Sequence, residues 1–444
     1  MKKIAIFGAG MSASSLIQYL LDHSTQLNCK IVLADLEIER AQEKLNNHPN
    51  GEARKFDIRN ANDVQSIISE CDYVISLMPA AFHPVIAKEC LKQSKNMFTA
   101  SYVSPEMLEM HDEVKRKGLL FINECGLDPG LDHMSAMKVI DELKGKGAKI
   151  LSFESNCGGL VAPEYDNNPW NYKLTWNARN VILAGQAGAK FIQDKKYKYI
   201  PYQQLFKRAT SIDFMDYGAF DVYPNRDSLS YREIYGLQGI ETLIRGTMRK
   251  PGYCQAYDAF IQLGMTDDTY VMENSDKLTY RDYVEAFLPC REGVTVEDNF
   301  CLTTGIEKGS DTYNKFVWLG IFENTQVKLT DGTPAQILQA IIEPKWALGS
   351  NDLDMILMQH RFVYELNGKK MERISSLVVI GKDKVHTAMA ITVGTTLAIA
   401  VKLFITGDLK ATGVVIPVKP EVYLPILNEL ENHGVKFVEE EKEI

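Results

Sequence analysis

Tyr102, Asp128 and Cys157 are the side chains of this sequence with the most evident capacity for acid–base chemistry, and each lies in a short polar segment. A phenol, a carboxylate and a thiol all take up or release protons when their surroundings adjust their acidity. We therefore predict an active site in which the catalytic candidates are, in this order, Asp128, Tyr102 and Cys157.

Each candidate also has a structural interpretation, which stays open at this stage. Asp128 precedes Pro129, and this pair is typical of a helix N-cap followed by the first helical residue. Tyr102 follows a strand end and precedes a Ser-Pro turn, and Cys157 has the composition of a small packed residue. His133 falls inside a predicted helix, where we expect a structural role.

A glycine-rich segment near the N-terminus predicts a dinucleotide site. Gly8, Gly10 and Ala13 have the G-x-G-x-x-A spacing, directly after the apolar run 4–7 and before a helical pattern. The first glycine permits a tight turn, the second lets the backbone approach a pyrophosphate, and Ala13 lets the helix pack closely. The phosphates would then lie on free N–H groups of the loop and helix start. The predicted cofactor-binding residues of this loop are Gly8, Gly10, Met11, Ser12 and Ala13.

Asp35 ends the second predicted strand, at the distance from the glycines where a carboxylate accepts hydrogen bonds from the adenosine ribose. A carboxylate there repels a 2′-phosphate, and the nearest downstream cation is Arg40. We therefore expect NAD to be favoured over NADP.

The elements that position these residues alternate between buried strands and helices, which predicts a doubly wound parallel sheet. The predicted strands of this domain, residues 1–130, are 4–7, 30–34, 73–77, 96–100 and 119–123.

The pattern changes further along the chain and predicts a mixed α+β domain over residues 131–385. Residues 150–155 are strand-like, and Asn367-Gly368 between two apolar runs predicts a β-hairpin with a type I′ turn. Thr333 and Pro334 are typical of the start of a helix. The apolar stretch 387–405 is almost long enough to span a bilayer, but we interpret it as a buried helix.

Composition narrows the class of protein. A chain of 444 residues exceeds one compact core, and a net charge of −9 disfavours nucleic acid as a partner. The eight cysteines show neither metal-ligand spacing nor a disulfide framework, so we expect no metal and a reducing, cytoplasmic setting. Because we interpret the stretch 387–405 as a buried helix, we expect no membrane association.

Residues 126–133 (GLDPGLDH) and 155–160 (SNCGGL), together with several further motifs, resemble the saccharopine dehydrogenase family of the L-glutamate-forming type, also called saccharopine reductase. The resemblance covers almost the whole chain, and the motifs GLDPGLDH and SNCGGL are more specific than the glycine fingerprint. It rests on residues 76–84, 99–105, 123–133, 154–164, 168–180, 223–228, 245–249 and 387–394.

This resemblance implies a homodimer of a variant Rossmann domain and a mixed catalytic and dimerisation domain, with residues 386–444 returning to the Rossmann domain. It implies NAD(P)-dependent interconversion of saccharopine with L-glutamate and 2-aminoadipate 6-semialdehyde, in lysine metabolism, without a fused reductase domain. The substrate-binding residues that it implies are Ser101, Tyr102, Cys157, Arg226 and Thr247. The cofactor-binding residues that it implies are Asp57, Ile58, Leu77, Met78, Leu127, Asp128, Pro129 and Trp176.

Two other functions remain open at this point. A related imine reductase, such as a carboxynorspermidine dehydrogenase, would act on a substrate with an amine in place of one carboxylated arm. Saccharopine carries three carboxylates, and the arginine of the segment 225–228 favours this triacid. A non-catalytic nucleotide sensor would keep the glycine loop but would need no substrate segments.

Overall fold

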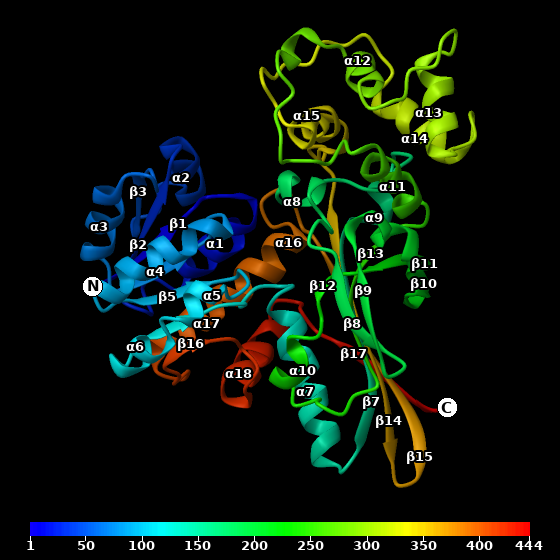
Figure 1. Ribbon diagram of the computed structural model, residues 1–444. Helices are drawn as coiled ribbons and strands as arrows, with labels where there is room; N and C mark the ends of the chain where they lie inside the picture. Colours follow the sequence, from blue (N-terminus) through cyan, green and yellow to red (C-terminus); the bar gives the residue numbers. More distant parts are fainter. The chain divides into compact units, whose positions relative to one another are not determined.

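The computed structural model describes residues 1–444 and divides into two compact units (Figure 1). The first unit comprises Met1–Ile150 and Tyr364–Ile444, and the second comprises Leu151–Val363. The divisions thus fall at 150/151 and 363/364, whereas we predicted them at 130/131 and 385/386. Helix α7 (Leu131–Gly145) belongs to the first unit because it packs on α18 (Pro420–Glu431), where Tyr423 donates a hydrogen bond of 2.6 Å to Asp141.

The first unit is built on a seven-stranded sheet in which every pair is parallel, in the order β16-β6-β5-β4-β1-β2-β3. This confirms the doubly wound parallel fold class, with strands buried on both faces as such sheets require. The strands are β1 (Lys2–Phe7), β2 (Cys29–Asp35), β3 (Gly51–Lys55), β4 (Tyr73–Ser76), β5 (Asn96–Thr99), β6 (Leu120–Ile122) and β16 (Gly413–Val415).

Helices cover both faces of this sheet. Side chains of α3 and α4 share a buried cluster with Phe7 and Val32, and α1 packs on the C-terminal helix α17 instead. The helices are α1 (Ser14–Asp22), α2 (Ile38–Leu45), α3 (Ala61–Glu70), α4 (His83–Lys92), α5 (Pro105–Leu108), α6 (His111–Arg116) and α17 (Thr396–Thr406).

The strand order reverses between β1 and β4. From β1 the chain proceeds to β2 and β3 on one side, and β4, β5 and β6 lie on the other. Ligands of open α/β sheets bind outside the carboxyl ends of the strands at such a switch point. The loops after β1, β4, β5 and β6 therefore share one edge of the sheet, which is the edge that carries the predicted site residues of this unit.

The C-terminal segment completes the first unit. Strand β16 pairs with β6, and α16 (Ala388–Ala390), a π-helical turn (Ile391–Thr395) and α17 form one apolar stretch. Gly394 allows close packing on α1, because a Cβ there would lie 2.9 Å from the backbone of Ser12 and Leu16. Residues Ala388–Thr406 are long and apolar enough to cross a membrane, and 78% of this window is buried inside the protein.

The second unit is a mixed α+β domain, as predicted. Its strands follow the order β10-β11-β13-β7-β14, with β13 parallel to β7 and antiparallel to β11. The strands are β7 (Lys149–Val161), β8 (Ala189–Gln193), β9 (Lys196–Ile200), β10 (Thr210–Asp213), β11 (Ala219–Pro224), β12 (Arg226–Asp227), β13 (Thr242–Arg249) and β14 (Asp354–Leu366).

An aromatic core organises the helices of the second unit. Trp170 and Trp346 are fully buried, with ring centroids 5.2 Å apart. Trp170 also stacks on Phe260 of α11 and meets Phe316 of α14 edge-on. The helices are α8 (Ala178–Ile182), α9 (Tyr202–Leu205), α10 (Tyr231–Ile234), α11 (Tyr253–Leu263), α12 (Tyr280–Glu285), α13 (Val296–Thr304), α14 (Asp311–Leu319) and α15 (Pro334–Trp346).

Two local predictions are confirmed. Asn367 and Gly368, with φ of 53° and 78°, form the turn between β14 and β15 (Lys369–Ile380), and β15 pairs with β17 (Val438–Glu443). Thr333 caps α15 through a reciprocal capping box with Gln336.

Candidate active site

The glycine loop has the geometry that a pyrophosphate requires. Gly8 lies at the switch point with φ of +101°, and a Cβ there would approach the Leu77 carbonyl oxygen to 3.0 Å, so no other residue fits. A Cβ at Gly10 would meet nothing within 4 Å, so the backbone is open to an approaching group.

The remaining loop residues leave room and donors for an anion. Met11 is exposed, Ser12 is half-buried and Ala13 is buried against the helix start. No side chain caps the turn Met11–Ala13 that precedes α1, so its first N–H groups are available to a ligand. The loop therefore fits a dinucleotide phosphate.

Asp35 connects the glycine loop to the end of β2. Its Oδ2 accepts a hydrogen bond of 2.7 Å from the Ala9 N–H, and its Oδ1 accepts one of 3.0 Å from the Glu37 N–H. An ionised carboxylate offers about four acceptor sites, so this side chain both anchors the loop and keeps capacity for a ribose hydroxyl. The sequence did not predict the anchoring role.

The other cofactor-binding residues predicted in this unit lie at two places, after β4 and after β3. Leu77 and Met78 follow β4, and the Leu77 N–H donates to the Phe7 carbonyl at the switch point. Asp57 and Ile58 are half-buried after β3, and the Arg59 guanidinium lowers the pKa of Asp57 to about 2. The Asp57 carboxylate is thus paired with the Arg59 guanidinium, with 2.7 Å between the two groups.

A histidine that we did not single out holds the Ser101 side chain. His83 is buried at the start of α4, with Nδ1 2.8 Å from the Ser76 hydroxyl and Nε2 2.6 Å from the Ser101 hydroxyl. Burial lowers the pKa of His83 to about 4, so the imidazole is neutral at ordinary pH. The available signal was its place in the segment 76–84, which follows a strand at the sheet edge.

Tyr102 and Asp128 meet at the same edge. The Tyr102 hydroxyl donates a hydrogen bond of 2.9 Å to Asp128 Oδ1, although the two residues follow different strands, β5 and β6. Both side chains are half-buried, so the pair is accessible to a ligand. The structure thus brings together the first two candidates for proton transfer.

The interpretation of Asp128 as a helix cap is wrong. The N-cap of α7 is Gly130, with φ of +144°, and no side chain caps it. Gly130 cannot be replaced, because a Cβ there would lie 2.2 Å from the Gly126 nitrogen. Leu127 and Pro129, on either side of Asp128, are buried, so they fix the loop and leave the carboxylate at its surface.

The second unit holds the other predicted substrate residues. Cys157 on β7 pairs in register with Thr247 on β13, and Thr247 pairs with Tyr223 on β11. Residues paired across a sheet point to the same face. Cys157 is buried, and Thr247 is half-buried and contacts the Tyr223 hydroxyl.

Two motif segments of this unit lie within strands. Asn156–Leu160 lies in the last part of β7, and Gly158 is explained by the neighbouring strand, since a Cβ there would lie 3.0 Å from Met248. Arg245 and Arg249 lie in strand β13, and both are buried. Arg249 lies among the rings of Tyr172, Tyr223 and Tyr253.

Arg226 and Trp176 occupy distinct positions in this unit. Arg226 is exposed on the short strand β12, has φ of 51° and pairs with Ala189 on β8. Trp176 is half-buried and packs against the aromatic core. Arg226 is therefore at the surface of the second unit, and its binding of a carboxylate stays a prediction.

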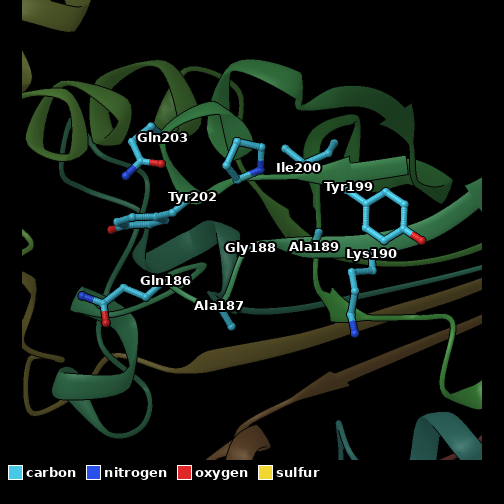
Figure 2. A pocket seen from close by; sticks show the side chains of 10 residues that line it. Gln186, Ala187, Gly188, Ala189, Lys190, Tyr199, Ile200, Tyr202 and Gln203 are labelled. Atoms are coloured by element: carbon cyan, nitrogen blue, oxygen red, sulfur yellow. The ribbon is translucent and has the colours of Figure 1, made fainter. Parts of the chain in front are cut away.

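The cavity of about 500 Å³ in the second unit does not contain the predicted site residues (Figure 2). Its wall comes from β8, β9 and the start of α9, and its one cation, Lys190, is paired with Asp227 at 2.7 Å. Because none of the predicted site residues lines this cavity and its one cation is already paired, we do not take it as the candidate active site. It is lined by Gln186, Ala187, Gly188, Ala189, Lys190, Tyr199, Ile200, Pro201, Tyr202 and Gln203.

Family models account for both parts of the chain. Residues 4–122 match the saccharopine dehydrogenase NADP binding domain, and residues 126–435 match the saccharopine dehydrogenase C-terminal domain. The chain belongs to the saccharopine dehydrogenase family. This confirms the resemblance seen in the motifs.

Members of the saccharopine dehydrogenase family resemble this chain from end to end. The saccharopine dehydrogenase [NADP(+), L-glutamate-forming] of Saccharomyces cerevisiae is 32% identical over 447 residues, covering 99% of each chain. The apo structure of that yeast enzyme superposes with a TM-score of 0.88 at 30% identity and covers 100% of both chains. The mitochondrial alpha-aminoadipic semialdehyde synthase of Rattus norvegicus is 32% identical over 98% of this chain, which spans 47% of that protein.

These names support a nicotinamide nucleotide as the cofactor. The family model and the yeast relative are both named for NADP, which points to NADP and not to the NAD that we expected from Asp35. The glycine loop by itself accommodates either nucleotide, because both carry the same pyrophosphate.

Proposed function

We propose that this chain interconverts saccharopine with L-glutamate and 2-aminoadipate 6-semialdehyde by hydride transfer at a C–N bond. The observation that carries this proposal is the Tyr102–Asp128 hydrogen bond at the sheet edge that also bears the glycine loop. The full-length similarity to the yeast enzyme of that name supports the substrate.

The reaction requires two kinds of step. The glycine loop would hold an oxidised nicotinamide nucleotide, which would supply the hydride acceptor for the carbon that becomes the aldehyde. The C–N single bond of saccharopine then becomes an imine, to which water adds, and the C–N bond breaks to leave the amine of glutamate and the aldehyde. Water loses a proton as it adds, and the nitrogen gains a proton as the C–N bond breaks, so the protein must hold a proton acceptor at the water and a proton donor at the reacting nitrogen.

Asp128 and Tyr102 are suited to this proton transfer. Asp128 accepts the hydrogen of the Tyr102 hydroxyl at 2.9 Å, so the phenol oxygen keeps lone pairs for a substrate N–H or a water. A proton taken by the phenol can pass to the carboxylate along this hydrogen bond. Cys157 is the third candidate, since its thiol lies beside Thr247 in the second unit.

Ser101 offers a hydroxyl of fixed direction for the substrate. Its oxygen lies 2.6 Å from His83 Nε2, and the other imidazole nitrogen is held by Ser76. Because the imidazole is neutral, it fixes the hydroxyl without adding charge. Arg226 and Thr247 supply a cation and a hydroxyl for the carboxylates of saccharopine, which an acidic protein must bind locally.

For the cofactor we keep NAD as the favoured nucleotide of this chain. The acid Asp35 ends β2, and Glu37 and Glu39 follow it, whereas Arg40 is already paired with Glu37 at 2.6 Å. A 2′-phosphate beside these carboxylates would meet like charge. Because the names of the relatives favour NADP, the preference of this chain between NAD and NADP is tested by the assay below.

The experiment is a turnover assay with the purified protein. Saccharopine is offered with NAD or with NADP, the nicotinamide absorbance is followed, and L-glutamate is quantified as product. We expect saccharopine to be turned over, with formation of the reduced nicotinamide nucleotide and of L-glutamate, and we expect a higher kcat/KM with NAD than with NADP. No turnover of saccharopine, or equal turnover of a substrate that has an amine in place of a carboxylated arm, would reject the proposed substrate. A tenfold or greater preference for NADP would reject the interpretation of Asp35.

A further inference from the structure

Three buried titratable side chains lie behind the Tyr102–Asp128 pair, and none of them takes part in the proposed chemistry. Glu124 and Asp132 are each 2% exposed, and His133 is fully buried. They come from the end of β6 and the first turn of α7. The three side chains are not a metal site, since no group of ligands in the chain has that geometry.

Glu124 holds the backbone on both sides of Tyr102. The Glu124 N–H donates a hydrogen bond of 2.9 Å to the carbonyl of Ser101, and Glu124 Oε1 accepts one of 3.0 Å from the N–H of Val103. Glu124 itself has φ of +53°, a left-handed conformation that a glutamate adopts only when its surroundings require it.

Asp132 holds the loop of Asp128 in the same manner. The Asp132 N–H donates a hydrogen bond of 3.0 Å to the carbonyl of Leu127, and Asp132 Oδ1 accepts one of 2.6 Å from the N–H of Gly130. One carboxylate residue thus spans the backbone around each member of the proton-transfer pair.

His133 joins these two carboxylates. Its Nε2 lies 2.8 Å from Glu124 Oε2, and its Nδ1 lies 3.6 Å from Asp132 Oδ2. An ionised carboxylate only accepts hydrogen bonds, so Nε2 donates to Glu124. The segment that carries Tyr102 is therefore tied to His133 through Glu124, and the Asp132 carboxylate, which holds the loop of Asp128, lies in contact with the same buried imidazole.

We propose that Glu124, His133 and Asp132 form a buried clamp that sets the distance between the Tyr102 hydroxyl and the Asp128 carboxylate. They are positioning residues, because they are shielded from solvent and act on the reaction through the backbone next to Tyr102 and Asp128. This role rests on the proposed function of that pair. Small displacements of reacting groups lower the reaction rate by large factors. A clamp that fixes the position of these groups is therefore useful even though burying its titratable side chains is unfavourable.

The test is a double-mutant cycle. Glu124→Ala should lower kcat for saccharopine by about 10- to 100-fold with little change in KM, and Glu124→Gln should recover part of the loss because its amide oxygen still accepts from Val103. In a Tyr102→Phe background the same Glu124→Ala change should alter kcat less than threefold, since the hydroxyl to be positioned is gone.

The control variant is Glu429→Ala. Glu429 binds Lys402 at 2.5 Å and the Tyr19 hydroxyl in the same unit, so its loss disturbs the fold without touching the loops of Tyr102 and Asp128. It should keep wild-type kcat. If Glu124→Ala lowers kcat by the same factor with and without the Tyr102 hydroxyl, or Glu429→Ala lowers it as much, the clamp does not act through Tyr102 and the proposal is wrong.

A second measurement does not depend on turnover. The urea midpoint of the Glu124→Ala variant should fall less when Tyr102 is already phenylalanine, because the two changes remove parts of one connected network. Additive shifts in midpoint would overturn the clamp even in a protein that does not turn over saccharopine. An inactive wild type with coupled midpoints would instead reject the proposed function and keep the clamp.

Discussion

Replacement of Asp128 by asparagine separates the chemical role of this residue from its structural role. In the wild-type protein the hydrogen bond from the Tyr102 hydroxyl to Asp128 is 2.9 Å long. The amide oxygen of asparagine can still accept it, so the geometry of the pair is preserved. A hydrogen bond to a charged group contributes about 1.5–3 kcal/mol and a neutral one about 0.5–1.5 kcal/mol, so stability should fall by about 1 kcal/mol. No helix cap is lost, because Gly130 is the cap.

The expected loss of activity is larger. Asparagine does not take up a proton, so kcat for saccharopine should fall by about 100-fold or more, which corresponds to about 2.7 kcal/mol or more in the activation free energy. One limb of the pH–rate profile should disappear. The assay compares kcat across pH with urea unfolding and nicotinamide nucleotide binding of the same Asp128→Asn preparation.

Two results would refute this reasoning. An Asp128→Asn variant that keeps most of its kcat and the whole pH profile would show that the carboxylate transfers no proton, and the role would pass to Tyr102 or Cys157. A variant with low kcat, a large loss of unfolding free energy and weak nucleotide binding would show that Asp128 acts by holding the loop.

Substitutions at Arg226, Asp35 and His83 test other parts of the site. Arg226→Ala should lower kcat/KM for saccharopine by about 10- to 150-fold while nucleotide affinity is unchanged, and unaltered kinetics would remove this residue from the site. Asp35→Asn keeps an acceptor for the Ala9 N–H but removes the charge, so it should narrow the NAD to NADP ratio of kcat/KM, and Asp35→Ser combined with Leu36→Arg should narrow or invert it. His83 has a folded pKa of about 4 against 6.5 for the free side chain, so the unfolded state binds the extra proton between these values. The unfolding free energy should therefore fall by up to about 3 kcal/mol as the pH drops through that window and stay constant above it, and His83→Asn should lose this dependence in urea titrations.

Much of the fold could be predicted because strongly apolar strands and glycine spacing are local signals. The strands that start at Lys2, Cys29 and Tyr73 lie where the sequence placed them. Strand β3 was missed because its residues, Gly51–Lys55, are half-buried at the sheet edge and carry no alternating apolar pattern. Strand β16 was missed because three residues form it, and pairing with β6 creates it.

The candidate site could be predicted as a set of residues but not as an arrangement. The types and motif positions of Tyr102 and Asp128 identified them as candidates, and nothing in their spacing indicated that they touch. His83 and Glu124 were passed over because a buried histidine or glutamate has no distinctive local pattern. Their partners, Ser101 and His133, become neighbours only when the strands align.

The sequence by itself determined what depends on neighbours along the chain. The glycine turn at Gly8, the capping box at Thr333 and the hairpin turn at Asn367 follow from backbone conformations that few residue types adopt, and the family follows from motifs. Only the tertiary structure decided that Asp128 is not the cap of α7. Pro129 after an acid is compatible with a cap or with an exposed carboxylate, and the choice depends on the contact of Gly130 with Gly126 and on where β5 places Tyr102. That choice is set by pairing between strands that are distant in sequence. The energy of this pairing depends on residues far apart, so a short stretch of sequence does not reveal it.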